Sequence, residues 1–196
     1  TVAGRKRLFL IIGAALLVFV FWLGGTGGEP IRVGFSGTLT GDFSDLGIQG
    51  RNGAILAVEE INARGGVNGR EISLVVRDDG GTKERAREAD RELIEEGVAA
   101  IIGHMTSSLS MAALPVVEEA GTVLFSPTTS TPKLSGKEDL FFRLNPSSDM
   151  EARALALYAR RHLGLENVNI CWDTNNAAYA QPFAEAFRTQ FTKTGG

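Results

Sequence analysis

Short apolar segments alternate with amphipathic segments from residue 30 onward. The apolar segments predict strands, and segments whose apolar residues recur at helical spacing predict helices. The expected strands are residues 31–35, 72–76, 98–103, 122–125, 140–143 and 167–172. The expected helices are residues 48–61, 82–96, 107–120, 148–162 and 178–193, the fourth opening on a capping box of Ser148 and Glu151. The alternation indicates βαβ units and a parallel sheet, which is an α/β fold.

A basic segment and a long apolar segment precede this pattern. Residues 5–7 are Arg-Lys-Arg, residues 8–23 are apolar throughout, and small residues follow. This order is typical of an export signal or a signal anchor, whose basic side stays in the cytoplasm. We therefore expect residues 8–23 to form an apolar helix that contacts the membrane, and residues 29–196 to lie outside the cytoplasm. The segment is either a cleaved signal or a retained inner-membrane anchor, and no cysteine follows it for lipid attachment.

Composition narrows the classes of function. The chain is 43% hydrophobic and 22% charged, which is typical of a folded globular protein. Residues 5–7 carry the only charges before Glu29, so the rest of the chain is more acidic than the overall net charge of −3. We expect no nucleic-acid partner, because that binding depends on Lys and Arg at phosphates. The single Cys171 excludes an intrachain disulfide and a thiolate metal cluster.

The sequence lacks the common catalytic motifs. It has no Gly-x-Ser-x-Gly elbow, no phosphate-binding loop and no His-Glu-x-x-His motif. His104 follows an expected strand with no acidic partner nearby in sequence, and His162 lies late in an expected helix. Asp78 and Asp79 are interpreted as ending a strand and orienting the next helix, with a metal or catalytic role as the alternative. We expect no enzyme activity, no cofactor and no metal.

Hydroxyl side chains dominate two loops at the expected carboxyl edge of the sheet, where open parallel sheets bind ligands. Residues 106–108 join the third strand to its helix, and residues 126–131 follow the fourth strand. The free N–H groups of a helix N-terminus, together with adjacent hydroxyls, form a cradle of neutral donors for a carboxylate. The alternative is ordinary helix capping by Ser107 and turn formation by residues 126–131.

Three stretches resemble type I periplasmic binding proteins of the branched-chain amino acid (leucine-binding) group, an extracellular ligand-binding receptor family. Residues 31–79, which begin IRVGFSGTLTGDF, look like the opening of such a protein. Residues 102–134 (IGHMTSSLSMAALPVVEEAGTVLFSPTTSTPKL) resemble its ligand-contact core. Residues 171–187 (CWDTNNAAYAQPFAEAF) resemble the first strand, loop and helix of its second lobe. The resemblance implies two Rossmann-like lobes, joined by a hinge, that close on a small ligand.

The resemblance also implies a division of the chain. Residues 1–28 are then the signal peptide or signal anchor with its linker. Residues 29–143 form ligand-binding lobe 1, a parallel sheet in the order 2-1-3-4-5, and residues 144–196 form the hinge crossing and the truncated start of lobe 2. Members of the group are considerably longer, so we expect this chain to be a fragment that binds ligand weakly or not at all by itself.

Individual site residues follow from the same resemblance. Ser107 and Ser130 correspond to hydroxyls that bind an amino-acid carboxylate, and Thr128 to a position that contributes its backbone. Tyr179 corresponds to a second-lobe tyrosine that closes over the ligand. Leu46 lies where some members carry an aromatic residue over the ligand, so the pocket for the ligand's side chain differs here.

Two functions remain open from the sequence. The first is an extracytoplasmic, periplasmic solute-binding protein that captures an amino acid or similar small carboxylate for the membrane subunits of an ABC-type importer. The alternative is the ligand-binding sensor domain of a membrane signalling receptor, coupled to a signalling module. The same fold serves both functions, so fold alone does not separate them.

Overall fold

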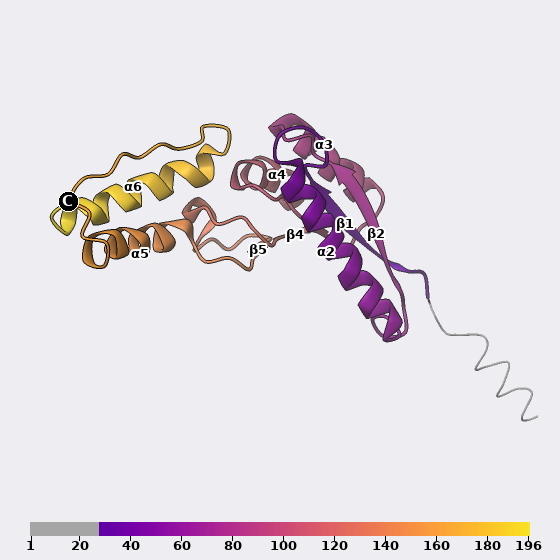
Figure 1. Cartoon of the computed structure of the whole chain (residues 1–196). Coiled ribbons are helices and arrows are strands. Elements are labelled where there is room, and N and C mark those ends of the chain that lie inside the picture. The colour runs from indigo at the N-terminus through magenta and orange to yellow at the C-terminus, as the bar shows by residue number, and fades with distance from the viewer. Residues whose placement is uncertain (1–27) are drawn as a thin grey trace, which may run out of the picture.

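The computed structural model describes residues 28–196 (Figure 1). The apolar helix expected at residues 8–23 lies outside these described residues. From residue 28 to residue 196, no helix combines the length and the apolar character needed to cross a membrane.

A parallel five-stranded sheet in the order β2-β1-β3-β4-β5 organises the first part of the chain. The strands are β1 (Ile31–Gly37), β2 (Ile72–Asp78), β3 (Ala100–Ile102), β4 (Val123–Ser126) and β5 (Phe141–Arg143). The first strand of the chain is interior, because Gly34 lies opposite Val75 on one side and Ile101 on the other. The carboxyl ends of all five strands therefore meet along one edge. The predicted α/β fold and strand order are confirmed.

Helices cover both faces of this sheet (Figure 1). They are α2 (Ser44–Ala63), α3 (Lys83–Glu95) and α4 (Ser107–Glu119), with a short 3-10 turn, η1 (Pro132–Leu134). Successive strand residues point to opposite faces. Ile101 packs in one core cluster with Leu93 of α3 and Val117 of α4, whereas Ile102 packs on the other face with Ala54 of α2. β3 is apolar throughout because helices cover it on both sides.

A second pair of helices extends beyond the sheet (Figure 1). α5 (Ser148–Arg161) and α6 (Ala177–Lys193) pack against each other, with Ala156 and Phe191 buried between them. Two hydrogen bonds connect the start of α6 to the start of α4. The Ser108 N–H donates to Asn176 Oδ1 at 3.1 Å, and the Ala178 N–H donates to Ser108 Oγ at 3.3 Å.

Two local predictions are wrong. Residues 167–172 were expected to form a strand, but within residues 28–196 no other strand pairs with this extended segment. A strand depends on a neighbour that bonds its N–H and C=O groups, and that neighbour is not a local property of the sequence. The predicted capping box is also absent, because Ser147 is the N-cap of α5 and its hydroxyl bonds to the carboxylate of Asp149.

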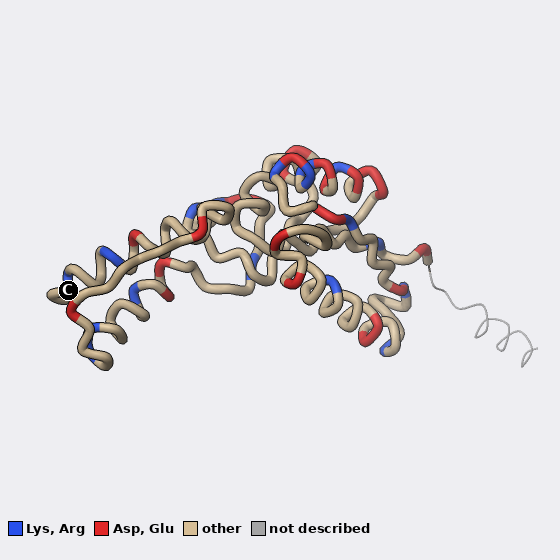
Figure 2. The backbone as a smooth tube through the Cα atoms, turned by 45° about the horizontal axis from the view of Figure 1, so that its top comes forward, with Lys and Arg blue, Asp and Glu red and all other residues tan. Residues whose placement is uncertain are grey.

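Charged residues of both signs are mixed over the described chain, most densely on α3 (Figure 2). Arg77 of the edge strand β2 pairs with Glu92 at 2.7 Å and also with Glu96. Arg85 of α3 pairs with the same Glu92 at 2.6 Å. The pairs of Arg77 connect strand β2 to the helix that follows it, and the Arg85–Glu92 pair lies within that helix.

Candidate functional site

The two hydroxyl-rich loops lie side by side where β3 and β4 end. Ser107 is the first residue of α4, and Thr106 is the N-cap, without a side-chain capping bond. The Ser107 hydroxyl instead accepts a hydrogen bond from the N–H of Ser130, at 3.3 Å across the two loops. The simple capping interpretation of Ser107 is therefore wrong, because its hydroxyl joins the loops and does not close its own helix.

Two further hydroxyls join the same loops. Thr128 Oγ1 donates to the carbonyl oxygen of Met105 at 2.8 Å. Ser126 Oγ donates to the carbonyl oxygen of His104 at 2.7 Å and accepts from the Thr129 N–H at 3.0 Å. Each loop thus satisfies backbone groups of the other, which holds the main chain of residues 103–107 and 126–131 in one arrangement.

The structure brings three of the five expected site residues together. Ser107 and Ser130 are 2% and 4% exposed, and Thr128 is half-buried beside them. Their donors and acceptors are hydroxyls and backbone groups, which suit a carboxylate and supply no nucleophile–base pair. The carbonyl oxygen of Thr128 also accepts a hydrogen bond from Asn145 Nδ2 at 3.2 Å. Asn145 lies on the segment that leads to α5.

Tyr179 and Leu46 lie apart from that group. Tyr179, in the first turn of α6, lines a cavity of about 570 Å³ together with Phe43, Trp172 and Phe183. Ser107, Thr128, Ser130 and Leu46 are not among the residues lining this cavity. Burial, and to a lesser extent the charge of Glu151, raise the pKa of the Tyr179 phenol. Leu46 is on α2, with 37% of its surface exposed.

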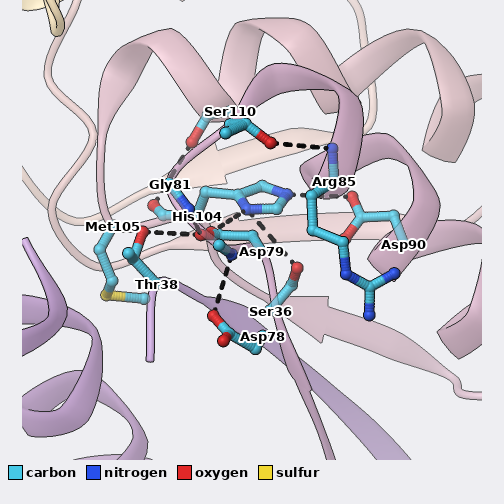
Figure 3. A network of polar contacts seen from close by, with 12 residues as sticks. Ser36, Thr38, Asp78, Asp79, Gly81, Arg85, Asp90, His104, Met105 and Ser110 are labelled. Carbon is cyan, nitrogen blue, oxygen red and sulfur yellow. Dashed lines mark hydrogen bonds and ion pairs between the residues drawn. The ribbon is translucent and has the colours of Figure 1, made fainter. Parts of the chain in front are cut away.

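A buried charged cluster under these loops was missed by the sequence analysis (Figure 3). His104 is fully buried and contacts two carboxylates. Its Nδ1 lies 2.7 Å from Asp79 Oδ2, and its Nε2 lies 3.3 Å from Asp90 Oδ2. Asp79 Oδ1 accepts from Thr38 Oγ1 at 2.6 Å and from the Gly81 N–H at 3.0 Å. β2 ends at Asp78, as predicted, but Thr82 and not Asp79 is the N-cap of α3. Asp79 bonds the loop before this helix and in addition binds His104.

The acidic partners of His104 are 25 and 14 positions away along the chain. One local signal was present, because Asp90 interrupts a buried helix face that also contains Ala86, Ala89 and Leu93. Burial alone lowers the pKa of His104, but hydrogen bonds to Asp79 and Asp90 and their negative charges outweigh it and raise the pKa to about 9. His104 is therefore an imidazolium at neutral pH.

In the part of the chain from residue 28 onward, no set of three or more His, Cys, Asp or Glu side chains is placed to hold a metal ion. Because the His104 ring is fully buried, it does not contact a molecule bound at the surface of the loops.

Comparison with known proteins assigns the chain to a family. The family model described as "Periplasmic binding protein" matches residues 30–196. The chain is 25% identical over 192 residues to a leucine-, isoleucine-, valine-, threonine- and alanine-binding protein of Pseudomonas aeruginosa, covering 97% of this chain and 50% of that protein. It is 30% identical over 167 residues to the Leu/Ile/Val-binding protein BraC3 of Rhizobium johnstonii, covering 84% and 45%. The chain thus spans about half the length of the curated relatives it matches.

Solved structures agree with these matches. A leucine binding protein, LivK, of Thermotoga maritima superposes with a TM-score of 0.78 at 28% identity, covering 85% of this chain and 47% of that one. An ABC transporter substrate-binding protein of Desulfitobacterium hafniense, solved in complex with Leu, gives 0.70 at 32% identity, covering 86% and 48%. The family match over residues 30–196, the shared fold and the adjacent hydroxyl loops lead to one conclusion: the chain belongs to the periplasmic binding proteins of the branched-chain amino acid group.

Proposed function

We propose that this chain supplies the first wall of an extracytoplasmic solute-binding protein, which captures an amino acid or a similar small carboxylate for an ABC-type importer. The observation that carries the proposal is the pair of joined hydroxyl loops at the carboxyl edge of the sheet. Relatives named for binding leucine, isoleucine and valine, and a substrate-binding protein solved with Leu, support the ligand class and the transport role. None of these names favours a signalling receptor.

In this proposal Ser107 and Ser130 hold the carboxylate of the ligand. Ser107 stands at the N-terminus of the 13-residue helix α4, where the helix dipole favours a negative group. Ser130 follows on the neighbouring loop, and Thr128 contributes backbone between them. Hydrogen bonds to a charged group are stronger than neutral ones, so few donors suffice to orient a small ligand.

Tyr179 and Leu46 have separate roles in the proposal. Residues 29–143 form lobe 1, and residues 144–196 form the crossing and the beginning of lobe 2. The change from sheet to the α5–α6 pair directly after β5 supports this division. Tyr179 then closes over the ligand from lobe 2, because the start of α6 is hydrogen-bonded to the start of α4. Leu46 borders the side chain of the ligand.

We further propose that residues 29–196 work outside the cytoplasm and that residues 8–23 direct their export, as a cleaved signal or as a retained anchor. The basic residues 5–7 before the apolar segment support this orientation. A phosphatase reporter fused after Gly196 should be active only when it is exported. Reporter activity that persists after the apolar segment is deleted would contradict the proposal.

Calorimetric titration tests the ligand class. With both lobes present, the protein should bind at least one of leucine, isoleucine and valine, and it should bind the corresponding amide about 10- to 100-fold more weakly, because the amide lacks the carboxylate that the hydroxyls hold. The amide keeps the ligand's side chain and ammonium group, so it is the matched control. Equal affinity for acid and amide would overturn the carboxylate assignment, and absence of binding to all three amino acids would overturn the ligand class.

A further inference from the structure

The buried cluster around His104 connects the loop after β3 to β1, to the end of β2 and to α3. The ring bonds Asp79 at the end of β2 and Asp90 on α3, while the Nδ1 atom also lies 3.5 Å from Ser36 Oγ of β1. Asp79 in turn accepts from Thr38, which follows β1. The side chain of His104 therefore anchors the β3–α4 loop to two neighbouring strands and a helix.

The main chain of the same residue organises the hydroxyl loops. The His104 carbonyl oxygen accepts from Ser126 Oγ at 2.7 Å, with Ser110 Oγ and Thr129 Oγ1 each at 3.4 Å. Ser110 and Thr129 also bond to each other at 2.7 Å. A displacement of His104 would therefore move the loop that carries Thr128 and Ser130.

The charges in the cluster require the imidazolium form of His104. Both ring nitrogens face carboxylate oxygens, and a neutral imidazole has only one N–H to donate. Asp90 Oδ1 is buried and makes no hydrogen bond within the described residues, so His104 is the main compensation for that carboxylate. With the proton lost, two buried carboxylates would face a neutral ring, and the cluster would loosen.

The other charged groups near the cluster point elsewhere. Asp78 accepts from the N–H groups of Leu39 and Gly80, at 2.8 and 2.9 Å. The Arg85 guanidinium pairs with Glu88 at 3.1 Å and with Glu92 at 2.6 Å. The titration of His104 therefore depends mainly on Asp79 and Asp90. The Ser36 hydroxyl of β1 also approaches the ring, whereas the Ser110 and Ser126 hydroxyls bond the main-chain carbonyl oxygen of His104.

We infer that His104 is a positioning residue for the ligand site: its protonated ring, clamped between Asp79 and Asp90, holds the two hydroxyl loops in the arrangement that binds a carboxylate. This inference rests on the proposed function. The cluster has one cation and two anions, so it acts through position and not by attracting the ligand's charge. Its removal weakens ligand binding even though His104 does not contact the ligand.

The thermodynamic linkage between ligand binding and protonation of His104 provides a test. A histidine with only a structural role would not change its protonation when ligand binds. If protonation of His104 favours the binding arrangement, bound ligand must favour protonation of His104 by the same factor. The chain contains two histidines, and the exposed His162 on the end of α5 serves as an internal control. Nuclear magnetic resonance of the protein with isotope-labelled histidine follows both rings separately, without any substitution.

The measurement is made at pH 9, near the midpoint of His104, with and without saturating leucine. A coupling of about fivefold moves the protonated fraction of His104 from about half to about four fifths, while His162 stays unchanged. Unchanged His104 signals at saturation with leucine overturn the inference. If none of leucine, isoleucine and valine binds the wild-type protein by calorimetry, the proposed ligand class fails. If one of them binds but leaves the His104 signals unchanged, only the inference about His104 fails.

A conservative variant provides the second arm. Asp90→Asn keeps the shape of the side chain but removes the charge that holds the proton on His104. We expect leucine affinity at pH 8 to fall about fivefold or more, with the far-ultraviolet circular dichroism of a folded protein retained. Glu118→Gln, an exposed carboxylate-to-amide change at the other end of α4, is the matched control and should bind like wild type. Wild-type affinity in folded Asp90→Asn contradicts the positioning role.

Discussion

The hydroxyl of Ser107 accepts a hydrogen bond from the backbone N–H of Ser130, 23 positions later in the chain. The bond joins the start of α4 to the loop after β4, and both residues are nearly buried. In the proposed function, a ligand carboxylate that enters between the loops meets a hydroxyl whose orientation is already fixed by this contact. Pre-organisation of this kind reduces the entropy that binding would otherwise cost.

The first prediction concerns Ser107→Ala. With both lobes present, leucine affinity should fall by about 1.5–3 kcal/mol, the range for a hydrogen bond to a charged group, because the variant removes the donor and frees the Ser130 N–H. Stability should fall by only about 1 kcal/mol. Calorimetry measures the affinity and urea unfolding the stability. Ser73→Ala, an exposed serine on the edge strand β2, is the control and should change neither; unchanged affinity in Ser107→Ala would exclude Ser107 from the site.

The second prediction concerns alkaline pH. The pKa of His104 is raised from 6.5 to about 9, so its contribution to stability is complete below pH 6.5 and is lost as pH rises through about 9. The free energy of unfolding should therefore fall over this range, by up to about 3 kcal/mol. Urea unfolding at a series of pH values measures the slope. His104→Gln should flatten it, whereas His162→Gln should keep it; a wild-type slope in His104→Gln would assign the effect to another group.

The third prediction compares two glycines of α2. A Cβ added at Gly47 would lie 1.7 Å from the backbone oxygen of Thr38, whereas a Cβ at Gly53 meets nothing within 4 Å. Gly47→Ala should therefore destabilise the protein by several kcal/mol or prevent folding, because backbone and not a flexible side chain must move. Gly53→Ala should stabilise it by about 0.5–1 kcal/mol, because alanine is the better helix former. Thermal unfolding of both variants checks the opposite signs.

The fourth prediction concerns the loop after β1. Asp78 accepts from the Leu39 N–H at 2.8 Å, the Gly80 N–H at 2.9 Å and Thr40 Oγ1 at 2.6 Å. Desolvation acts in the opposite direction, but these bonds together lower the pKa of Asp78. Asp78→Ala should destabilise the protein by about 1.5–3 kcal/mol at pH 7.

The sign of the acid dependence follows from that lowered pKa. The contribution of Asp78 is present above pH 3.8 and is lost as pH falls through its lower folded-state pKa, so wild type and Asp78→Ala should converge in stability there. Asp42→Ala, on the exposed part of the same loop, is the comparison variant. Its stability should remain near that of wild type both at pH 7 and at the low pH where Asp78 is protonated. A difference that persists undiminished at low pH would mean that the carboxylate is not the stabilising group.

Periodicity predicted the elements that nearby residues determine. It failed for a strand, because a strand also needs a partner from a distant part of the chain. The helix of residues 82–96 carries its apolar residues on one face, and the structure has α3 there with Thr82 as N-cap. The segment 167–172 alternates Asn with apolar residues at its start and ends on Cys171 and Trp172, a pattern that a strand can have, yet it lacks a partner within the described residues. His104 shows the same limit at the site, because its two carboxylates come from distant positions that only the sheet order brings together.

The interior place of β1 has a consequence for how the protein folds. The first strand is synthesised before both neighbours, and Gly34 bonds its partners only when residues 75 and 101 have arrived. Contacts between residues so far apart in sequence slow folding, because a long loop must close before the contact compensates its entropy. β1 therefore gains its second neighbour only after β3 has been synthesised. Such a delay suits a polypeptide that is expected to thread through a membrane before it folds.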